Sequence, residues 1–140
     1  MSQREFETLA AFRQTLARFL GFSEAAAAAA GLTPTQYQAL LALKGSGGAL
    51  SIGELAERLH VHHHSAVGLV DRLEALGLAR RALDAADARR VRVTPTAKGE
   101  RRVGQLAAIH RDELQTTAKT LGGLLRRLAA APRSRGPAKR

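Results

Sequence analysis

The sequence predicts a mainly α-helical fold with one small β-hairpin. Over most of the 140 residues, apolar side chains recur at spacings of three and four, which is the period of an amphipathic helix. In two short central segments, 78–83 and 90–94, this period is lost, and the second segment alternates arginine with valine as strands do. Glycine, proline and hydroxyl residues stand between the segments, at positions where helices start and stop. Helices on both sides of one hairpin therefore make up the expected fold.

The charge of the chain indicates a polyanionic partner. Its formal net charge is +10, from 22 Lys and Arg against 12 Asp and Glu. The segment 78–94 holds five arginines and two aspartates, and the segment 126–140 holds six basic residues and no acidic one. DNA is the polyanion that this distribution favours. A merely solvated arginine-rich surface is the alternative, and it suits the C-terminal segment better than the central one.

Residue types that are missing argue against several classes of protein. Without cysteine, the chain has no disulfide, no thiolate zinc site and no thiol redox sensor. No apolar run is long enough to span a bilayer, and the first residues are too polar for a signal peptide. We therefore expect a cytoplasmic protein with one domain over residues 1–131 and a basic, disordered tail over residues 132–140.

The first helix is expected over residues 2–30. Phe6, Phe12 and Phe19 lie on an apolar stripe that is wider than one small lobe needs for its own core. Part of this stripe is thus available for a second copy of the chain, although an ordinary intramolecular core is the alternative.

A capping box, Thr33-Pro34-Thr35-Gln36, starts the next helix and places proline at the first helical position. This helix closes at Gly45. Tyr37 is the only tyrosine of the chain. A tyrosine at a helical core spacing is more often packed in the core than placed in a ligand cavity.

A second capping box, Ser51-Ile52-Gly53-Glu54, opens the centre of the chain and starts a short helix that stops near His60. Another helix is expected from about His63 to Leu76, with Gly77 ending it as a C′ glycine. Its apolar face must be buried. The opposite face, which looks outward, carries His63, His64, Val67, Gly68 and Asp71.

Two strands are expected over residues 78–83 and 90–94, joined by the polar segment 84–89. Helix, turn, helix and basic hairpin, in this order, are typical of the winged helix-turn-helix. In this fold the second helix enters the major groove of DNA, and the hairpin, or wing, can place an arginine in the minor groove.

After the wing, a long helix is expected from Thr94 or Thr96 to about Leu114, with His110 in the core or at an interface. A break at residues 115–117 then separates it from a last helix. Leucines at helical spacing, Leu121, Leu124, Leu125 and Leu128, give this last helix an apolar face.

These segments resemble the MarR family of transcriptional regulators. The matching residues are LTPTQYQALLAL at 32–43, SIGELAERL at 51–59, SAVGLVDRLEALGLARR at 65–81, DAR at 87–89 and TAKG at 96–99. The chain departs from the family at 60–64, where histidines stand in place of small hydroxyl residues, and at Pro95. The resemblance implies dimerisation through helices at 1–30 and 96–131, and a DNA-binding lobe at 32–95. For such proteins it also implies a small aromatic effector that weakens DNA binding.

The resemblance and the exposed faces together select candidate DNA contacts. Ser65 and His64 are expected to donate to bases or phosphates, and Val67 can touch a thymine methyl. At the wing tip, Arg89 should enter the minor groove, with Asp87 holding it or the turn in place. The full set of predicted DNA-binding residues is Ser51, His62, His63, His64, Ser65, Val67, Gly68, Arg72, Asp87, Arg89 and Arg90, of which Arg72 and Arg90 are expected on phosphates.

The histidine cluster raises a metal site as an alternative, because imidazole binds zinc and nickel. Adjacent helical residues diverge by about 100°, so His63 and His64 cannot both converge on one ion. An enzyme is also disfavoured. Ser65, His64 and Asp71 are the residue types of a hydrolase, but helical neighbours lack the geometry of a nucleophile and its base, and no oxyanion-hole loop accompanies them.

We therefore expect a sequence-specific transcriptional regulator, a homodimeric repressor that binds a near-palindromic site in double-stranded DNA. No cofactor, metal, membrane or enzymatic activity is expected. A sequence-neutral architectural DNA-binding protein is the alternative, because charge alone would permit it.

Overall fold

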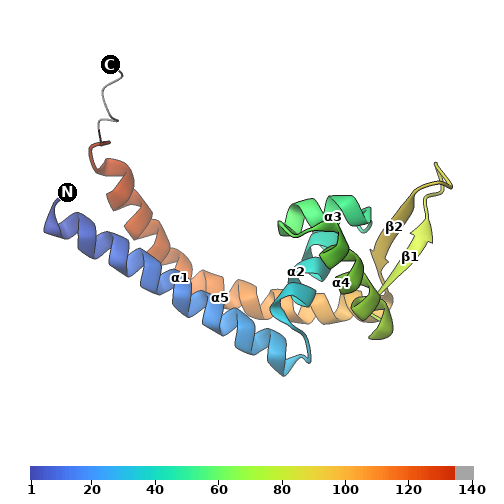
Figure 1. Cartoon of the computed structure of the whole chain (residues 1–140). Coiled ribbons are helices and arrows are strands. Elements are labelled where there is room, and N and C mark those ends of the chain that lie inside the picture. The colour runs from blue at the N-terminus through green and yellow to red at the C-terminus, as the bar shows by residue number, and fades with distance from the viewer. Residues whose placement is uncertain (135–140) are drawn as a thin grey trace, which may run out of the picture. The chain divides into compact units, whose positions relative to one another are not determined.

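The computed structural model describes residues 1–134, so most of the predicted tail at 132–140 lies outside the described residues. Figure 1 shows the helices and the hairpin in order along the chain. The elements are α1 (Gln3–Ala29), α2 (Pro34–Gly45), α3 (Ile52–Leu59), α4 (His63–Ala75), β1 (Ala79–Leu83), β2 (Val91–Pro95) and α5 (Ala97–Ala130). The predicted fold, mainly helical with a hairpin wing, is confirmed. Within the described residues, no helix has the length and apolar character needed to cross a membrane.

The chain divides into two compact units. The terminal unit consists of residues 1–22 and 111–140, and the central unit consists of residues 23–110. The central unit is longer than the DNA-binding lobe predicted at 32–95, because it also takes in the end of α1 and the first part of α5.

Leucine side chains from α2, α3 and α4 form the centre of the core in the central unit. Leu40, Leu43, Leu55 and Leu73 are fully buried there. Val103 and Leu106 of α5 and Ala27 of α1 belong to the same cluster. The helix-turn-helix therefore packs on segments that lie before and after it in the sequence.

Both predicted capping boxes are present. Thr33 Oγ1 accepts from the Gln36 amide at 3.1 Å, and Gln36 Oε1 accepts from the Thr33 amide at 3.0 Å. At α3, Ser51 Oγ accepts from the Glu54 amide at 3.1 Å, and the Glu54 carboxylate accepts from the Ser51 amide at 3.2 Å. Each box satisfies two amides that a helix start otherwise leaves without a partner.

The turn between α3 and α4 depends on a histidine in the left-handed region, because His60 has φ of 55°. Left-handed φ is uncommon for residues other than glycine. At the other end of α4, Gly77 has φ of 72°, as its predicted role in ending the helix requires.

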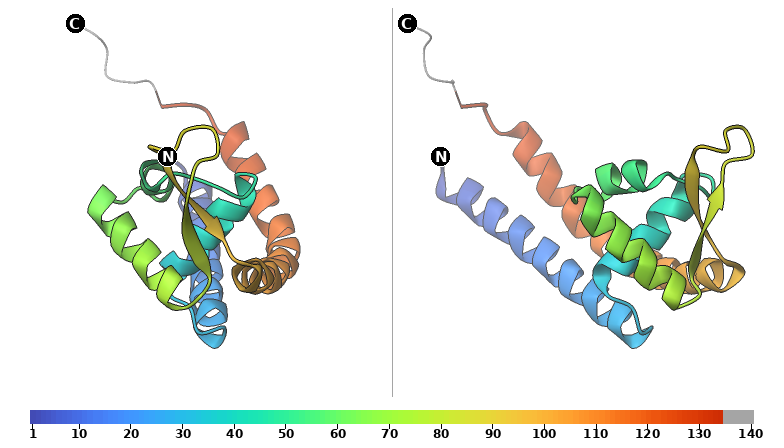
Figure 2. Two further views of the ribbon diagram at one scale, coloured as in Figure 1. Left: turned by 90° about the vertical axis from the view of Figure 1, so that its right-hand side faces the viewer. Right: turned by 45° about the vertical axis from the view of Figure 1, so that its right-hand side comes forward.

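The strands β1 and β2 pair antiparallel, with Ala79 opposite Pro95 and Leu83 opposite Val91. Leu50 forms an isolated bridge to Val93, through N···O distances of 3.1 and 2.7 Å. This bridge attaches the base of the hairpin to the segment before α3, while the distal part projects from the helices of the central unit (Figure 2).

One predicted feature is wrong, because α5 is a single helix and has no break at 115–117. That segment holds neither glycine nor proline, so nothing in it must interrupt a helix. The Thr116 hydroxyl donates to the Asp112 carbonyl one turn earlier, at 3.4 Å. A threonine bonded in this way is accommodated within a helix.

The start of α5 packs closely on the residues that follow α4. Thr96 is the N-cap, since its Oγ1 accepts from the Gly99 amide at 3.1 Å. The same hydroxyl donates to the Gly77 carbonyl at 2.6 Å, and Lys98 Nζ donates to the Leu76 carbonyl at 3.1 Å. A Cβ atom on Gly99 would overlap the carbonyl group of Leu78. Glycine is therefore required at this contact.

His110 lies in the core of the central unit, one of its two predicted locations. Its Nδ1 lies 2.7 Å from the Leu106 carbonyl oxygen and its Nε2 lies 2.7 Å from Ser23 Oγ. The ring stacks on Tyr37, with centroids 4.5 Å apart. Burial raises the pKa of the Tyr37 hydroxyl. Tyr37 is thus the packed core residue that the sequence predicts.

Candidate nucleic-acid interface

Helix α4 separates a buried face from an exposed one. Ala66, Leu69, Val70 and Leu73 are buried. The predicted DNA contacts in and next to α4 differ in exposure. His62, His63, His64, Ser65 and Arg72 are exposed, whereas Val67 and Gly68 are half-buried. The structure therefore places a row of polar side chains over the first turn of α4.

The amino end of α4 has no side-chain cap. His62 is the N-cap residue and makes no capping hydrogen bond, in contrast to Thr33 and Ser51. Its ring stacks parallel to that of His64, with centroids 5.6 Å apart. Amides at a helix start attract anions, and the histidine side chains stand beside them.

Two predicted contact residues of α4 line one pocket. The pocket has a volume of about 410 Å³, and Ser65 and Arg72 lie on its wall. Thr33 and Thr35, at the start of α2, line it together with Val61 and Leu69. An arginine and three hydroxyl residues among the lining suit a phosphate or carboxylate group.

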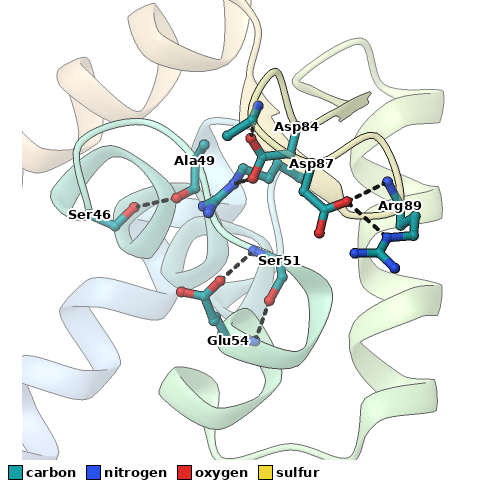
Figure 3. Close-up of polar contacts among 9 residues, drawn as sticks. Ser46, Ala49, Ser51, Glu54, Asp84, Asp87 and Arg89 are labelled. Atoms are coloured by element: carbon teal, nitrogen blue, oxygen red, sulfur yellow. Dashed lines mark hydrogen bonds and ion pairs between the residues drawn. The ribbon is translucent and has the colours of Figure 1, made fainter.

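Figure 3 shows the wing tip and the capping box of α3. Asp87 Oδ1 accepts from the Arg89 amide at 3.0 Å and from Arg89 Nε at 3.3 Å. The predicted Asp87–Arg89 contact is thus present. The Arg89 side chain is nevertheless 92% exposed, and its two terminal nitrogens are not used in this contact. They remain free to bind acceptors outside the protein.

The ion pairs of two wing arginines, first Arg92 and second Arg81, were not predicted from the sequence. Arg92 Nε donates to Asp84 Oδ2 at 2.8 Å, inside the hairpin. Arg81 pairs with Asp71 at 2.8 Å and with Glu74, which joins β1 to α4. The strand register, which pairs Leu83 with Val91 and so puts Asp84 diagonally across from Arg92, could have indicated the first. The second requires the packing of β1 on α4, which sequence spacing does not give.

Two residues that the sequence made candidates, Asp71 for a hydrolase and Ser51 for DNA binding, have partners inside the protein. Asp71 is held by Arg81, on the strand that follows α4, and Ser51 is engaged in its capping box. Among residues 1–134, no group of three or more His, Cys, Asp or Glu side chains is arranged to hold a metal ion.

Comparison with known proteins identifies relatives of this chain. Residues 30–90 match the family model of the MarR family. The uncharacterized HTH-type transcriptional regulator YcgE of Bacillus subtilis (strain 168) is 33% identical over 105 residues, which span 75% of this chain and 68% of YcgE.

Solved structures of similar fold extend the comparison. A MarR family protein from Bacillus stearothermophilus has a TM-score of 0.73 at 26% identity, over 92% of this chain and 96% of that one. Bordetella bronchiseptica BpsR, whose DNA binding is regulated by 6-hydroxynicotinic acid, has a TM-score of 0.63 at 25% identity, over 86% and 91%.

Proposed function

This chain belongs to the MarR family, and on that premise we propose that it is a homodimeric repressor, which binds a near-palindromic operator and leaves it when a small aromatic effector binds. Its family makes it a DNA-binding transcriptional regulator and not an enzyme. The observation that supports the proposal best is the pairing of an exposed polar face on α4 with a wing whose tip carries the exposed Arg89. Such a protein acts in the cytoplasm, where its operator is.

The proposal assigns α4 to the major groove. His64 and Ser65 donate to base edges or phosphates, and Val67 contacts a thymine methyl. Gly68 and Arg72 lie next to each other, because a Cβ on Gly68 would lie 3.6 Å from Arg72 Nη1. The Ser65–Arg72 pocket then receives a backbone phosphate.

The proposal also places DNA phosphates at the amino ends of α4 and α3 and beside the wing. His62 and His63 stand at the amino end of α4, and Ser51 at that of α3, where helix amides and dipoles favour anions. Arg90, which is exposed just before β2, binds a phosphate beside the minor groove. Asp87 orients Arg89 toward that groove.

The effector part of the proposal rests on a relative. DNA binding by BpsR is regulated by 6-hydroxynicotinic acid, which is a small aromatic acid. A ligand of this class should weaken operator binding by the present chain. Titration of the protein–DNA complex with a panel of aromatic acids tests this, and a panel without any effect would count against effector release.

Selection of bound DNA from a random pool tests class and specificity together. A regulator should enrich one near-palindromic sequence, with half-sites about 10 base pairs apart, because a twofold dimer meets successive major grooves. It should also remain bound to that sequence in the presence of competitor DNA. An unenriched pool would instead favour the architectural alternative.

The protein is expected to be a dimer at micromolar concentration. Large apolar side chains are exposed in the terminal unit, with Phe6 at 56%, Leu20 at 64% and Leu125 at 51%. Burial of such side chains stabilises by about 1.5–3 kcal/mol each. Sedimentation equilibrium should give the dimer mass, and Leu20→Glu with Leu125→Glu should shift it to the monomer. Leu76→Glu changes an exposed leucine of the central unit and serves as the control.

DNA affinity is expected to rise severalfold as the pH falls from 8 to 6 at fixed ionic strength. Histidine side chains ordinarily gain a proton in this range, and the added charge attracts phosphate. Changing His62, His63 and His64 together to Gln should remove most of the pH slope. His60→Gln, in the turn before α4, should leave it largely intact. A full slope in the triple variant would show that these side chains do not face DNA.

A further inference from the structure

The two aspartates of the wing tip make different contacts (Figure 3). Asp87 bonds with its carboxylate to Arg89, two residues away. Asp84 connects three points of the hairpin. Its Oδ2 accepts from Arg92 Nε at 2.8 Å, its Oδ1 accepts from the Ala86 amide at 2.9 Å, and its own amide donates to the Arg90 carbonyl at 2.8 Å. Asp84 therefore closes the tip at its base.

The pair formed by Asp84 and Arg92 is shielded, whereas Arg89 is not. The side chain of Asp84 is 15% exposed and that of Arg92 is 34% exposed, against 92% for Arg89. Shielded ion pairs are screened less by salt than exposed ones. The bonds from Arg92 and from the Ala86 amide hold the pKa of the Asp84 carboxyl below its usual range. This carboxylate is thus ionised, and the pair is formed, at neutral pH.

A tip that carries an exposed arginine gains from being ordered in advance. Fixing loose backbone and a long side chain on binding costs conformational entropy, which reduces affinity. The segment between the strands has few contacts with the core, since Ala85, Ala86, Ala88 and Arg89 are all exposed. Its order rests on the aspartate contacts and on the bond from the Arg90 amide to the Asp87 carbonyl at 2.9 Å.

We propose that Asp84 is a positioning residue for DNA binding: through Arg92 and the Ala86 amide, it holds the wing tip in the conformation in which Arg89 reaches the minor groove. The inference rests on the proposed role of Arg89. The proposed role of Asp84 predicts an unusual effect of removing a negative charge on DNA affinity. Removal of an acidic residue ordinarily strengthens binding to DNA, because it removes repulsion from phosphates. Removal of Asp84 should weaken binding instead.

The test compares two variants that each lose one carboxylate from the central unit. Asp84→Ala should bind the DNA site enriched from the random pool about tenfold more weakly at physiological salt, because the tip must then be ordered on binding. Glu57→Ala, on the exposed surface of α3, should bind as tightly as the unchanged protein or more tightly. In the free protein, amide hydrogen exchange at Ala86 and Arg90 should be faster in Asp84→Ala and unchanged in Glu57→Ala.

A double variant distinguishes positioning from general damage to the lobe. If Asp84 acts through Arg89, then Asp84→Ala should cost little more once Arg89 is already alanine. Additive losses would overturn the inference, as would an Asp84→Ala protein that binds as tightly as the unchanged one. Should Arg89→Ala itself bind normally, the proposed wing contact fails, and the role of Asp84 fails with it. A weakened Arg89→Ala beside a normal Asp84→Ala rejects only the positioning role.

Discussion

Gly99→Ala is expected to destabilise the central unit by about 3 kcal/mol or more, at the upper end of the usual cost of overpacking. The added methyl group would overlap the carbonyl of Leu78, which is backbone and cannot rotate away. To admit it, the start of α5 must separate from the residues after α4. The bonds from Thr96 to Gly77 and from Lys98 to Leu76 would then be strained or lost.

The matched control is Gly104→Ala, five residues further along the same helix. A Cβ atom there meets nothing within 4 Å, and the residue is exposed. Alanine in a helix is favoured over glycine by about 0.5–1 kcal/mol, so this variant should be slightly more stable. Urea unfolding followed by circular dichroism measures both. Equal stability of the two variants would show that α5 does not approach Leu78 so closely.

Arg89→Ala should cost about 1–3 kcal/mol in operator binding, as the loss of a good specific contact does. Its exposed guanidinium can enter a minor groove, whose negative potential deepens where A·T pairs narrow it. The fold should be unchanged, since Arg89 lies outside the core.

Arg133→Ala is the comparison for charge alone. Arg133 is exposed after the end of α5, and a charge there contributes only screened attraction to DNA. Its loss should therefore cost much less than that of Arg89. Binding titrations at physiological salt that give equal losses would show that the wing is not a groove reader. The basic charge would then act as a diffuse counter-charge.

The features that were predicted correctly are those set by neighbours in the sequence. The two capping boxes span four residues each, and the Asp87–Arg89 contact spans three. Gly77 ends its helix through a local backbone preference. Each of these depends on backbone geometry that a few adjacent residues fix by themselves, and the periodicity of apolar residues then places the helices between them.

The features that were missed depend on how separate segments pack. Arg81 meets Asp71 and Glu74 only because β1 lies along α4, and Asp84 meets Arg92 only in this strand register. The break predicted in α5 was wrong for a different reason, because it was inferred from local residue types alone. Gln115, Thr116 and Thr117 weaken a helix only slightly, and the turns on either side carry it through. Weak local preferences do not decide such positions.

Helix α4 is secured unequally at its two ends. At its carboxyl end, the carbonyls of Leu76 and Gly77 are bonded by Lys98 and Thr96, whereas His62 leaves the amino end uncapped. The helix should therefore fray from the end that carries the histidines, while its other end stays wound. An anion bound at the frayed end would supply the missing acceptor and complete the first turn. By mass action, operator DNA should then raise the unfolding temperature of the very lobe that binds it.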